Sequence, residues 1–260
     1  FLDDTLKTPE DVKRALDVPT LGSIARTKGG AAPNNLISTH EPLSLETEAY
    51  RTLRANVRVS FVDEPLRTLV VTSPSASEGK TTTLANLGVV MAQAGNRVVL
   101  VDTDLRRSML HKRFEVPNRE GLTNALLEDE PVLDGWLRET EIENLRVLTS
   151  GPLPPNPSEL LGSQKMRQLI ERLKDEADII LFDTPPILML SDASVLAMET
   201  DGVLLIADAG RTRRTAARQS VERLQQLGVN VVGVVLNRVR PKRSKSYEYY
   251  QYVATQDKQE

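Results

Sequence analysis

Residues 68–83 read TLVVTSPSASEGKTTT, a short apolar strand that runs into a loop of small residues and then into a helix. This order of strand, loop and helix is typical of a phosphate-binding loop. Backbone N–H groups at the start of such a helix point toward anions, and the helix macrodipole adds partial positive charge. Lys80 can reach a β or γ phosphate, and Thr81 can bind Mg²⁺. The first glycine of the usual G-x-x-x-x-G-K-[ST] pattern is replaced by Pro74, so the loop alone is a weak signal.

Two further apolar runs each end in carboxylates. Residues 97–104 read RVVLVDTD, and residues 178–186 read DIILFDTPP. Near-continuous runs of this kind suit strands buried on both faces of a parallel sheet, and ligands bind outside the carboxyl ends of such strands. A single aspartate here is more simply explained as a helix or turn cap, but three beside a phosphate loop favour a common site. The expected crevice contains Lys80, Thr81, Asp102, Asp104 and Asp183.

Strands alternate with helices along the chain, which predicts an α/β fold with a doubly wound, mostly parallel sheet flanked by helices, like that of the P-loop NTPases but with deviant nucleotide-binding motifs. A helix should follow the phosphate loop to about residue 94, where Gly95 stops it. The other expected strands lie at 20–25, at the sheet edge, and at 145–149, 202–207 and 231–237. The other expected helices lie at 9–16, 44–61, 122–128, 157–174 and 212–227.

The pattern predicts three parts. Residues 1–42 form an N-terminal, juxtamembrane-like segment whose end, 27–42, reads as a flexible linker by its Gly, Pro, Asn and Ser content. Residues 43–239 form the nucleotide-binding domain. Residues 240–260 form a flexible tail, in which YEYYQY holds four of the five tyrosines of the chain.

Composition excludes several classes of protein. The chain has 260 residues, no cysteine and a net charge of -3, so disulfides, thiolate metal sites and iron–sulfur clusters are excluded and no nucleic-acid signature is present. No stretch reaches the roughly 20 apolar residues that span a bilayer, and no signal peptide is recognisable. Phe1 stands at the start in place of Met, which predicts that the chain is a piece of a longer protein.

A phosphate loop, Mg²⁺ and carboxylates supply most of what phosphoryl transfer needs, but they do not choose the acceptor. Water as acceptor gives an ATPase, and a hydroxyl gives a kinase. A third alternative is a nucleotide-binding scaffold whose tail another kinase modifies. The tail tyrosines are candidate acceptors for a kinase. A phenol, with an ordinary pKa of about 10, needs a base at neutral pH, and Asp102 or Asp104 can serve.

Four motifs together resemble those of the bacterial tyrosine kinases, the cytoplasmic autokinase domains of polysaccharide co-polymerases that control capsule and exopolysaccharide export. They are ASEGKTT, VVLVDTDLR, ILFDTPP and the tyrosine cluster, and the similarity also covers GPLPPNPSELL and VLLIADAGRTRR. The related ATPases of chromosome partition and division-site selection share the nucleotide motifs but lack the tyrosines. Such ATPases also usually carry a second lysine early in the loop, where residues 72–76 here read TSPSA.

The resemblance implies ATP and Mg²⁺ as cofactors and gives roles to residues. Lys80 and Thr81 would hold phosphate and metal, and Thr82 would lie on the α-phosphate side. Asp102 would bind Mg²⁺ and help to deprotonate the tyrosine, Asp104 would complete the acidic motif, and Asp183 would support the metal. Arg106 fits a basic position of the family without an assigned role. Further nucleotide contacts are expected from Ser77, which replaces a common glycine, and from Glu78, Gly79, Asn237 and Arg238.

The resemblance also implies acceptors and partners. Glu48, Arg51 and Arg54 match the E-x-x-R-x-x-R motif through which the family forms rings; without the resemblance, this spacing indicates only a surface ion pair of about 0.2–0.5 kcal/mol. One subunit's tail would then enter its neighbour's active site. A transmembrane activator, a tyrosine phosphatase and a location at the cytoplasmic face of the bacterial membrane would follow, with no nucleic-acid partner. The expected phosphoacceptors are Tyr247, Tyr249, Tyr250 and Tyr252.

Overall fold

The computed structural model describes residues 3–26, 34, 36–61, 65–128 and 133–240. One eight-stranded sheet crosses this part of the chain in the order β1-β8-β7-β2-β6-β3-β5-β4. All neighbours pair in parallel except β4 with β5, so the predicted doubly wound, mostly parallel sheet is confirmed. The strands are β1 (Thr20–Ala25), β2 (Thr68–Thr72), β3 (Val98–Asp102), β4 (Leu137–Glu139), β5 (Leu145–Leu148), β6 (Ile179–Asp183), β7 (Gly202–Asp208) and β8 (Val231–Val239).

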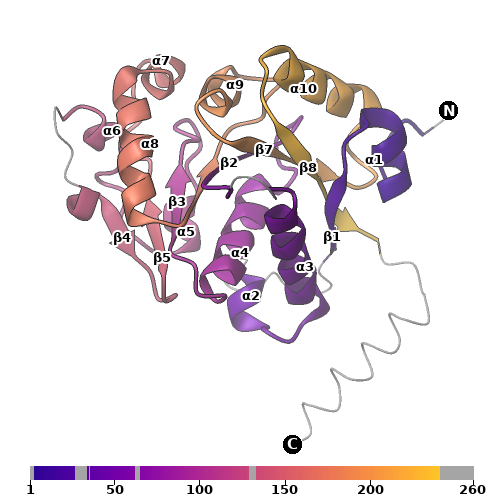
Figure 1. Cartoon of the computed structure of the whole chain (residues 1–260), viewed down its shortest axis with the longest axis horizontal. Helices are drawn as coiled ribbons and strands as arrows, with labels where there is room; N and C mark the ends of the chain where they lie inside the picture. The colour runs from indigo at the N-terminus through magenta and orange to yellow at the C-terminus, as the bar shows by residue number, and fades with distance from the viewer. Residues whose placement is uncertain (1–2, 27–33, 35, 62–64, 129–132, 241–260) are drawn as a thin grey trace, which may run out of the picture.

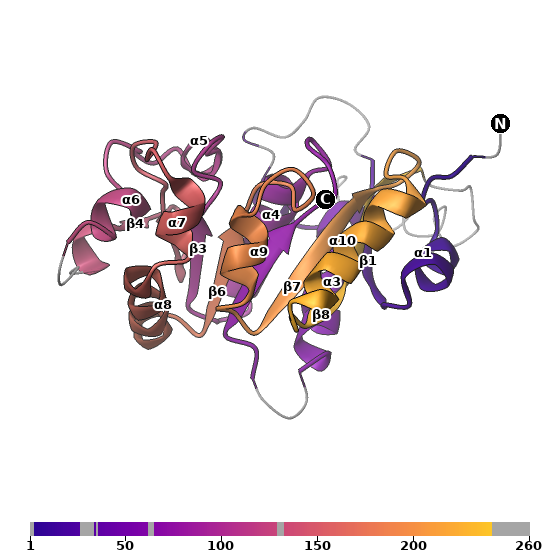
Figure 2. The same cartoon turned by 90° about the horizontal axis from the view of Figure 1, so that it is seen from above.

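Helices cover both faces of the sheet (Figures 1 and 2). One face carries α2 (Ile37–His40), α3 (Leu45–Val59), α4 (Lys80–Ala92) and α5 (Leu110–Arg113). The other carries α1 (Pro9–Leu16), α8 (Gln164–Glu176), α9 (Asp192–Ala197) and α10 (Arg214–Gln226), and the short α6 (Leu122–Ala125) and α7 (Pro157–Leu161) pack with this layer.

Strand β2 shows why its sequence is apolar throughout. All five of its residues are buried. Because side chains alternate along a strand, Leu69 and Val71 pack into the cluster with α3 and α4, whereas Val70 packs into the cluster with α8 and α9. The central position of β2 in the sheet brings the loop that follows it to the middle of the carboxyl edge.

The N-terminal segment is continuous with this sheet. Strand β1 is the edge strand that the sequence predicts, and it pairs with β8. Helix α1 begins at a reciprocal cap, in which Thr8 accepts from the backbone of Asp11 and the Asp11 carboxylate accepts from the backbone of Thr8. Val12 and Leu16 of α1 are buried against α10. A division of the chain at residue 42 therefore remains a proposal.

Three predictions of local structure were wrong or incomplete. The expected linker contains α2, because Leu36 and Ile37 are buried and outweigh the surrounding polar composition. The expected helix at 157–174 is interrupted at Gly162 and Ser163, where the Ser163 hydroxyl caps the new helix α8 by accepting from the N–H of Met166. Helices α5 and α9 and strand β4 were not predicted. Among the residues described, no helix combines the length and apolar content needed to span a bilayer.

Candidate active site

Two buried aspartates lie side by side at the carboxyl edge of the sheet. Asp102 ends β3 and Asp183 ends β6, and the two residues are direct partners in the parallel ladder. Their relative exposures are 0% and 1%. One carboxylate oxygen of Asp102 accepts the N–H groups of Met109 and Leu110, both at 2.9 Å. The Oδ1 atom of each aspartate has no hydrogen-bond partner among the described residues.

The environment disfavours negative charge on both aspartates. Burial, followed by the charge of Asp183, raises the pKa of Asp102 well above its ordinary value. Burial raises the pKa of Asp183 to about 7, although the Lys80 ammonium and the Thr81 hydroxyl act in the opposite direction. Two buried carboxylates with unpartnered oxygens are a donor set suited to a divalent cation, whose charge would offset this cost.

The donor set fits Mg²⁺ in particular. Within the described ranges, no three His, Cys, Asp or Glu side chains gather into a metal-binding group. Mg²⁺ is usually bound through one or two carboxylates together with phosphates and water, so a closed protein cage is not required. Asp102, Asp183 and Thr81, which donates to Asp183 Oδ2 at 2.6 Å, are the residues that would hold it.

The phosphate loop is built on an unusual backbone. Gly79 caps α4 with a φ of 97°, a left-handed conformation that favours glycine. A Cβ atom at this position would lie 2.1 Å from Asn237 Nδ2. Ser77, which stands where the resemblance expects glycine, also has a positive φ of 64°. Lys80 follows as the first residue of α4, and its side chain is buried.

Strands β7 and β8 support this loop from the side. Asn237 Nδ2 donates to the Glu78 carbonyl at 2.9 Å, and Arg238 Nη1 donates to the Ser77 carbonyl at 2.8 Å. The same guanidinium contacts Asp208 Oδ2 at 2.6 Å. The loop is thus held in shape by side chains from strands that are more than 120 residues away in the sequence.

Glu78 is a buried carboxylate within the loop. It accepts from the Thr212 hydroxyl at 2.6 Å and from the Ser75 N–H at 3.0 Å. Burial raises its pKa despite these donors. Its side chain therefore points into the protein, and it contributes to the site by shaping the loop.

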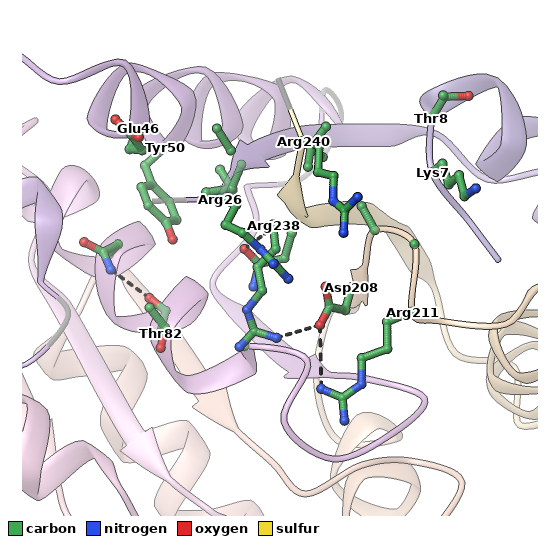
Figure 3. Close-up of a pocket in the computed structure, with 18 of the residues that line it drawn as sticks. Lys7, Thr8, Arg26, Glu46, Tyr50, Thr82, Asp208, Arg211, Arg238 and Arg240 are labelled. Atoms are coloured by element: carbon green, nitrogen blue, oxygen red, sulfur yellow. Dashed lines mark hydrogen bonds and ion pairs between the residues drawn. The ribbon is translucent and has the colours of Figure 1, made fainter. Parts of the chain in front are cut away.

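A cavity of about 1150 Å³ opens beside the loop (Figure 3). It borders the loop on the side of Gly79 and Thr82, and it is not lined by Lys80, Asp102 or Asp183. The ends of β1, β7 and β8 and the start of α3 form its walls. A volume of this size can hold a nucleoside next to phosphates bound at the loop. The labelled residues that line it are Lys7, Thr8, Arg26, Glu46, Tyr50, Thr82, Asp208, Arg211, Arg238 and Arg240.

The structure brings most of the sequence-predicted residues to this edge, but not all of them. Asp104 is less buried than Asp102 and accepts the N–H of Arg107. Arg106 is turned toward α9, where its Nε lies 3.3 Å from the buried Asp192. The four tail tyrosines lie outside the described residues. Tyr50, the remaining tyrosine, is only 3% exposed, so it is not available as an acceptor.

The residues of the expected interface lie on α3. Glu48 and Arg51 form an ion pair with each other. Arg54 donates instead to the Val90 carbonyl of α4 at 2.7 Å, so part of this motif makes contacts within the chain. The assignment of these three residues to an interface stays a prediction.

Sequence reasoning missed several residues of the site. Asp208 ends the apolar strand β7, as Asp102 and Asp183 end theirs, so the same signal could have found it. Thr212 lies in the segment VLLIADAGRTRR, but the sequence gives it no role, and Arg113 lies in no motif. Their place in the site depends on long-range contacts, which the sequence does not reveal.

Comparisons with known proteins identify the family of this chain. The family described as "CobQ/CobB/MinD/ParA nucleotide binding domain" matches residues 69–258. "Tyrosine-protein kinase YwqD" of Bacillus subtilis (strain 168) is 37% identical over 228 residues, which cover 88% of this chain and 96% of that protein. The chain belongs to the bacterial tyrosine kinases. This membership confirms the family and the fold class that the motifs indicate.

Two solved structures of this kinase family have the same fold. "Crystal structure of the chimerical protein CapA2B2" is 35% identical, with a TM-score of 0.84, and the match covers 90% of this chain and 100% of that chain. "The kinase domain of Escherichia coli tyrosine kinase ETK" is 31% identical, with a TM-score of 0.84, and the match covers 92% and 97% of the two chains. The structural similarity therefore extends over almost the whole of both kinase domains.

The conformation of Gly79 leads to a first prediction. Gly79→Ala should abolish nucleotide binding, because the new methyl group meets Asn237 in addition to the cost of a positive φ. Gly95→Ala is the matched control, since Gly95 has a φ of 88° but nothing within 4 Å of its Cβ position. It should cost about 1 kcal/mol of stability and leave binding intact. Titration with a fluorescent ADP analogue checks this, and equal affinities for the two variants would contradict it.

The buried Glu78 leads to a second prediction. Its raised pKa means that the folded chain binds more protons than the unfolded chain, so this group destabilises the fold as pH rises above the ordinary glutamate value. Glu78→Gln should therefore raise the urea midpoint at about pH 8 and have little effect at about pH 4. The exposed Glu222 of α10 supplies the control, Glu222→Gln, which should show no such trend. If the urea midpoints of Glu78→Gln and Glu222→Gln changed with pH in the same way, the result would contradict this prediction.

Proposed function

We propose that this kinase transfers the γ-phosphoryl group of ATP to tyrosines in the tail of a neighbouring copy of itself. The observation that carries the proposal is the pair of buried aspartates beside the phosphate loop, in a chain whose last residues contain four clustered tyrosines. The loop and the aspartates supply positioning and charge, and the tyrosines supply the acceptor.

The nucleotide would lie with its phosphates at the start of α4 and its nucleoside in the adjoining cavity. Lys80 would contact the β and γ phosphates, and Thr81, Asp102 and Asp183 would hold Mg²⁺. When bound, Mg²⁺ neutralises the charge that develops on the phosphate oxygens. Lys80, Asp102 and Asp183 are buried, which limits the water around them and strengthens their electrostatic effect.

In the transfer step, the tyrosine oxygen forms a bond to the γ phosphorus while the bond from that phosphorus to the bridging oxygen of ADP breaks. The phenol proton passes to a carboxylate. Asp104 is better placed to receive it, because Asp102 is fully buried and one of its oxygens already accepts two backbone N–H groups. Asp102 would then act mainly through the metal.

Asn237 and Arg238 line the cavity in which the base would lie. Both also donate to carbonyls of the phosphate loop. Contact with the adenine is therefore proposed as a second role, after support of the loop. Ser77, Glu78 and Gly79 would contribute through the loop backbone, and Thr82 through its hydroxyl.

The assembly is proposed on the family resemblance and the exposed Glu48–Arg51 pair. Copies of the chain would form a ring in which each tail enters the next active site. A transmembrane activator, fused or separate, and a tyrosine phosphatase would be its partners, at the cytoplasmic face of the membrane. The pathway served would be capsule or exopolysaccharide synthesis. The net charge of -3 supports no nucleic-acid partner.

Incubation of the purified chain with Mg-ATP tests this function. Phosphotyrosine should accumulate in residues 247–252 and disappear in Lys80→Met, which loses the ammonium near the phosphates, with a fall in rate of at least about 100-fold. The exposed Lys112→Met is the control and should keep the wild-type rate. Release of phosphate without phosphotyrosine would instead indicate an ATPase, and the absence of both would indicate a nucleotide-binding scaffold.

A further inference from the structure

Arg113 is a cation at the nucleotide cavity to which no role has been given. It is the last residue of α5, it is partly buried, and it lines the cavity together with Thr82. Its Nη2 donates to the Thr82 hydroxyl at 3.3 Å, and its Nη1 donates to the Asn34 carbonyl at 2.9 Å. Its Nε is buried and has no hydrogen-bond partner within the described part of the chain.

The position of Arg113 is set by the buried aspartate of β3. Asp102 accepts the N–H groups of Met109 and Leu110, which begin α5. Leu110 and Phe114, on either side of the arginine, are buried in the core below α4. The helix is therefore fixed at its start by a hydrogen-bonded carboxylate and along its length by packing, so Arg113 is presented to Thr82 by a rigid support.

Thr81 and Thr82 face different parts of the site. Consecutive residues of a helix point about 100° apart, which follows from about 3.6 residues per turn. Thr81 donates to Asp183 and so faces the metal side, whereas Thr82 lines the cavity. With the nucleotide placed as proposed above, a side chain that contacts Thr82 would lie near the phosphate that joins the nucleoside, and away from the phosphate that is transferred.

Arg113 forms no ion pair with a carboxylate among the residues described. Burial lowers the pKa of its guanidinium, and the charge of Asp183 acts in the opposite direction. Arginine nonetheless stays protonated in proteins, and a partly desolvated guanidinium at a cavity wall is a strong partner for phosphate oxygens. The Thr82 hydroxyl, which accepts from Arg113, keeps its own proton to donate.

We infer that Arg113 binds the nucleotide phosphate that lies above Thr82, on the nucleoside side of the transferred group. The inference rests on the proposed function for the position of the nucleotide. Because this phosphate is shared by ATP and ADP and does not change charge in the transfer, Arg113 contributes uniform binding. It should therefore affect KM and not kcat.

The test compares Arg113→Gln, Arg113→Lys and the exposed control Arg119→Gln. Titration with Mg-ADP and Mg-ATP should show affinities about 10- to 100-fold lower for Arg113→Gln, a smaller loss for Arg113→Lys, and none for the control. Adenosine has no phosphate, so it should bind to the wild type and to all three variants with the same affinity. In tail phosphorylation, Arg113→Gln should raise the KM for ATP and leave kcat unchanged.

Several outcomes would overturn the inference. One is wild-type affinity for Mg-ADP in Arg113→Gln. Another is an equal loss of adenosine and Mg-ADP binding, which would mean that Arg113 only positions Asn34 and the cavity wall. If Arg113→Gln does not fold, Arg113→Lys replaces it in the test. Wild-type affinity of Arg113→Lys for Mg-ADP would then overturn the inference. A wild-type chain that binds Mg-ADP but forms no phosphotyrosine refutes the proposed function alone, and one that binds no nucleotide refutes both.

Discussion

The site depends on the burial of two carboxylates next to each other. Asp102 and Asp183 end neighbouring parallel strands at the same level, so the sheet itself forces them together in a place from which water is excluded. The resulting cost is visible in the raised pKa of both groups. Such an arrangement is hard to explain as a contribution to stability, and a cation supplied with the nucleotide removes the cost.

Neighbouring elements are arranged around this pair. Helix α4 begins with Lys80 and reaches Asp183 through the Thr81 hydroxyl, and α5 begins at the backbone groups that Asp102 accepts. On the far side of the loop, Thr212, Asn237 and Arg238 fix Glu78 and Ser77. Hydrogen bonds within the chain thus hold the loop in shape, and such preorganisation lowers the entropic cost of binding.

Sequence patterns predicted the parts of the fold that depend on local signals. The apolar runs gave β2, β3, β6, β7 and β8 with small errors at their ends, because strands buried on both faces are continuous in sequence. Short elements such as α5, α9 and β4 were missed, since a few residues carry no measurable period. The break at Gly162 and Ser163 was missed, although glycine and serine are residue types that end and cap helices.

The site divides in the same way. Lys80, Thr81, Asp102 and Asp183 follow from motifs at strand ends, and the sheet brings them together as expected. Arg113 and Thr212 reach the site only through tertiary contacts with residues 31 and 134 positions away, which no local pattern encodes. Asn237 and Arg238 were expected to contact the nucleotide, and both line the cavity. Their hydrogen bonds to the loop carbonyls were not predicted, because the need of these carbonyls for donors arises only once the loop turns inward.

Diffraction from crystals grown with ADP and Mn²⁺, collected at a wavelength where manganese scatters anomalously, tests the central claim most directly. The account predicts one anomalous peak beside the loop, about 2.0–2.2 Å from the Thr81 hydroxyl and within reach of the unpartnered oxygens of Asp102 and Asp183. A nucleotide bound in the loop with the metal elsewhere, or with both aspartates still lacking a cation, would contradict it.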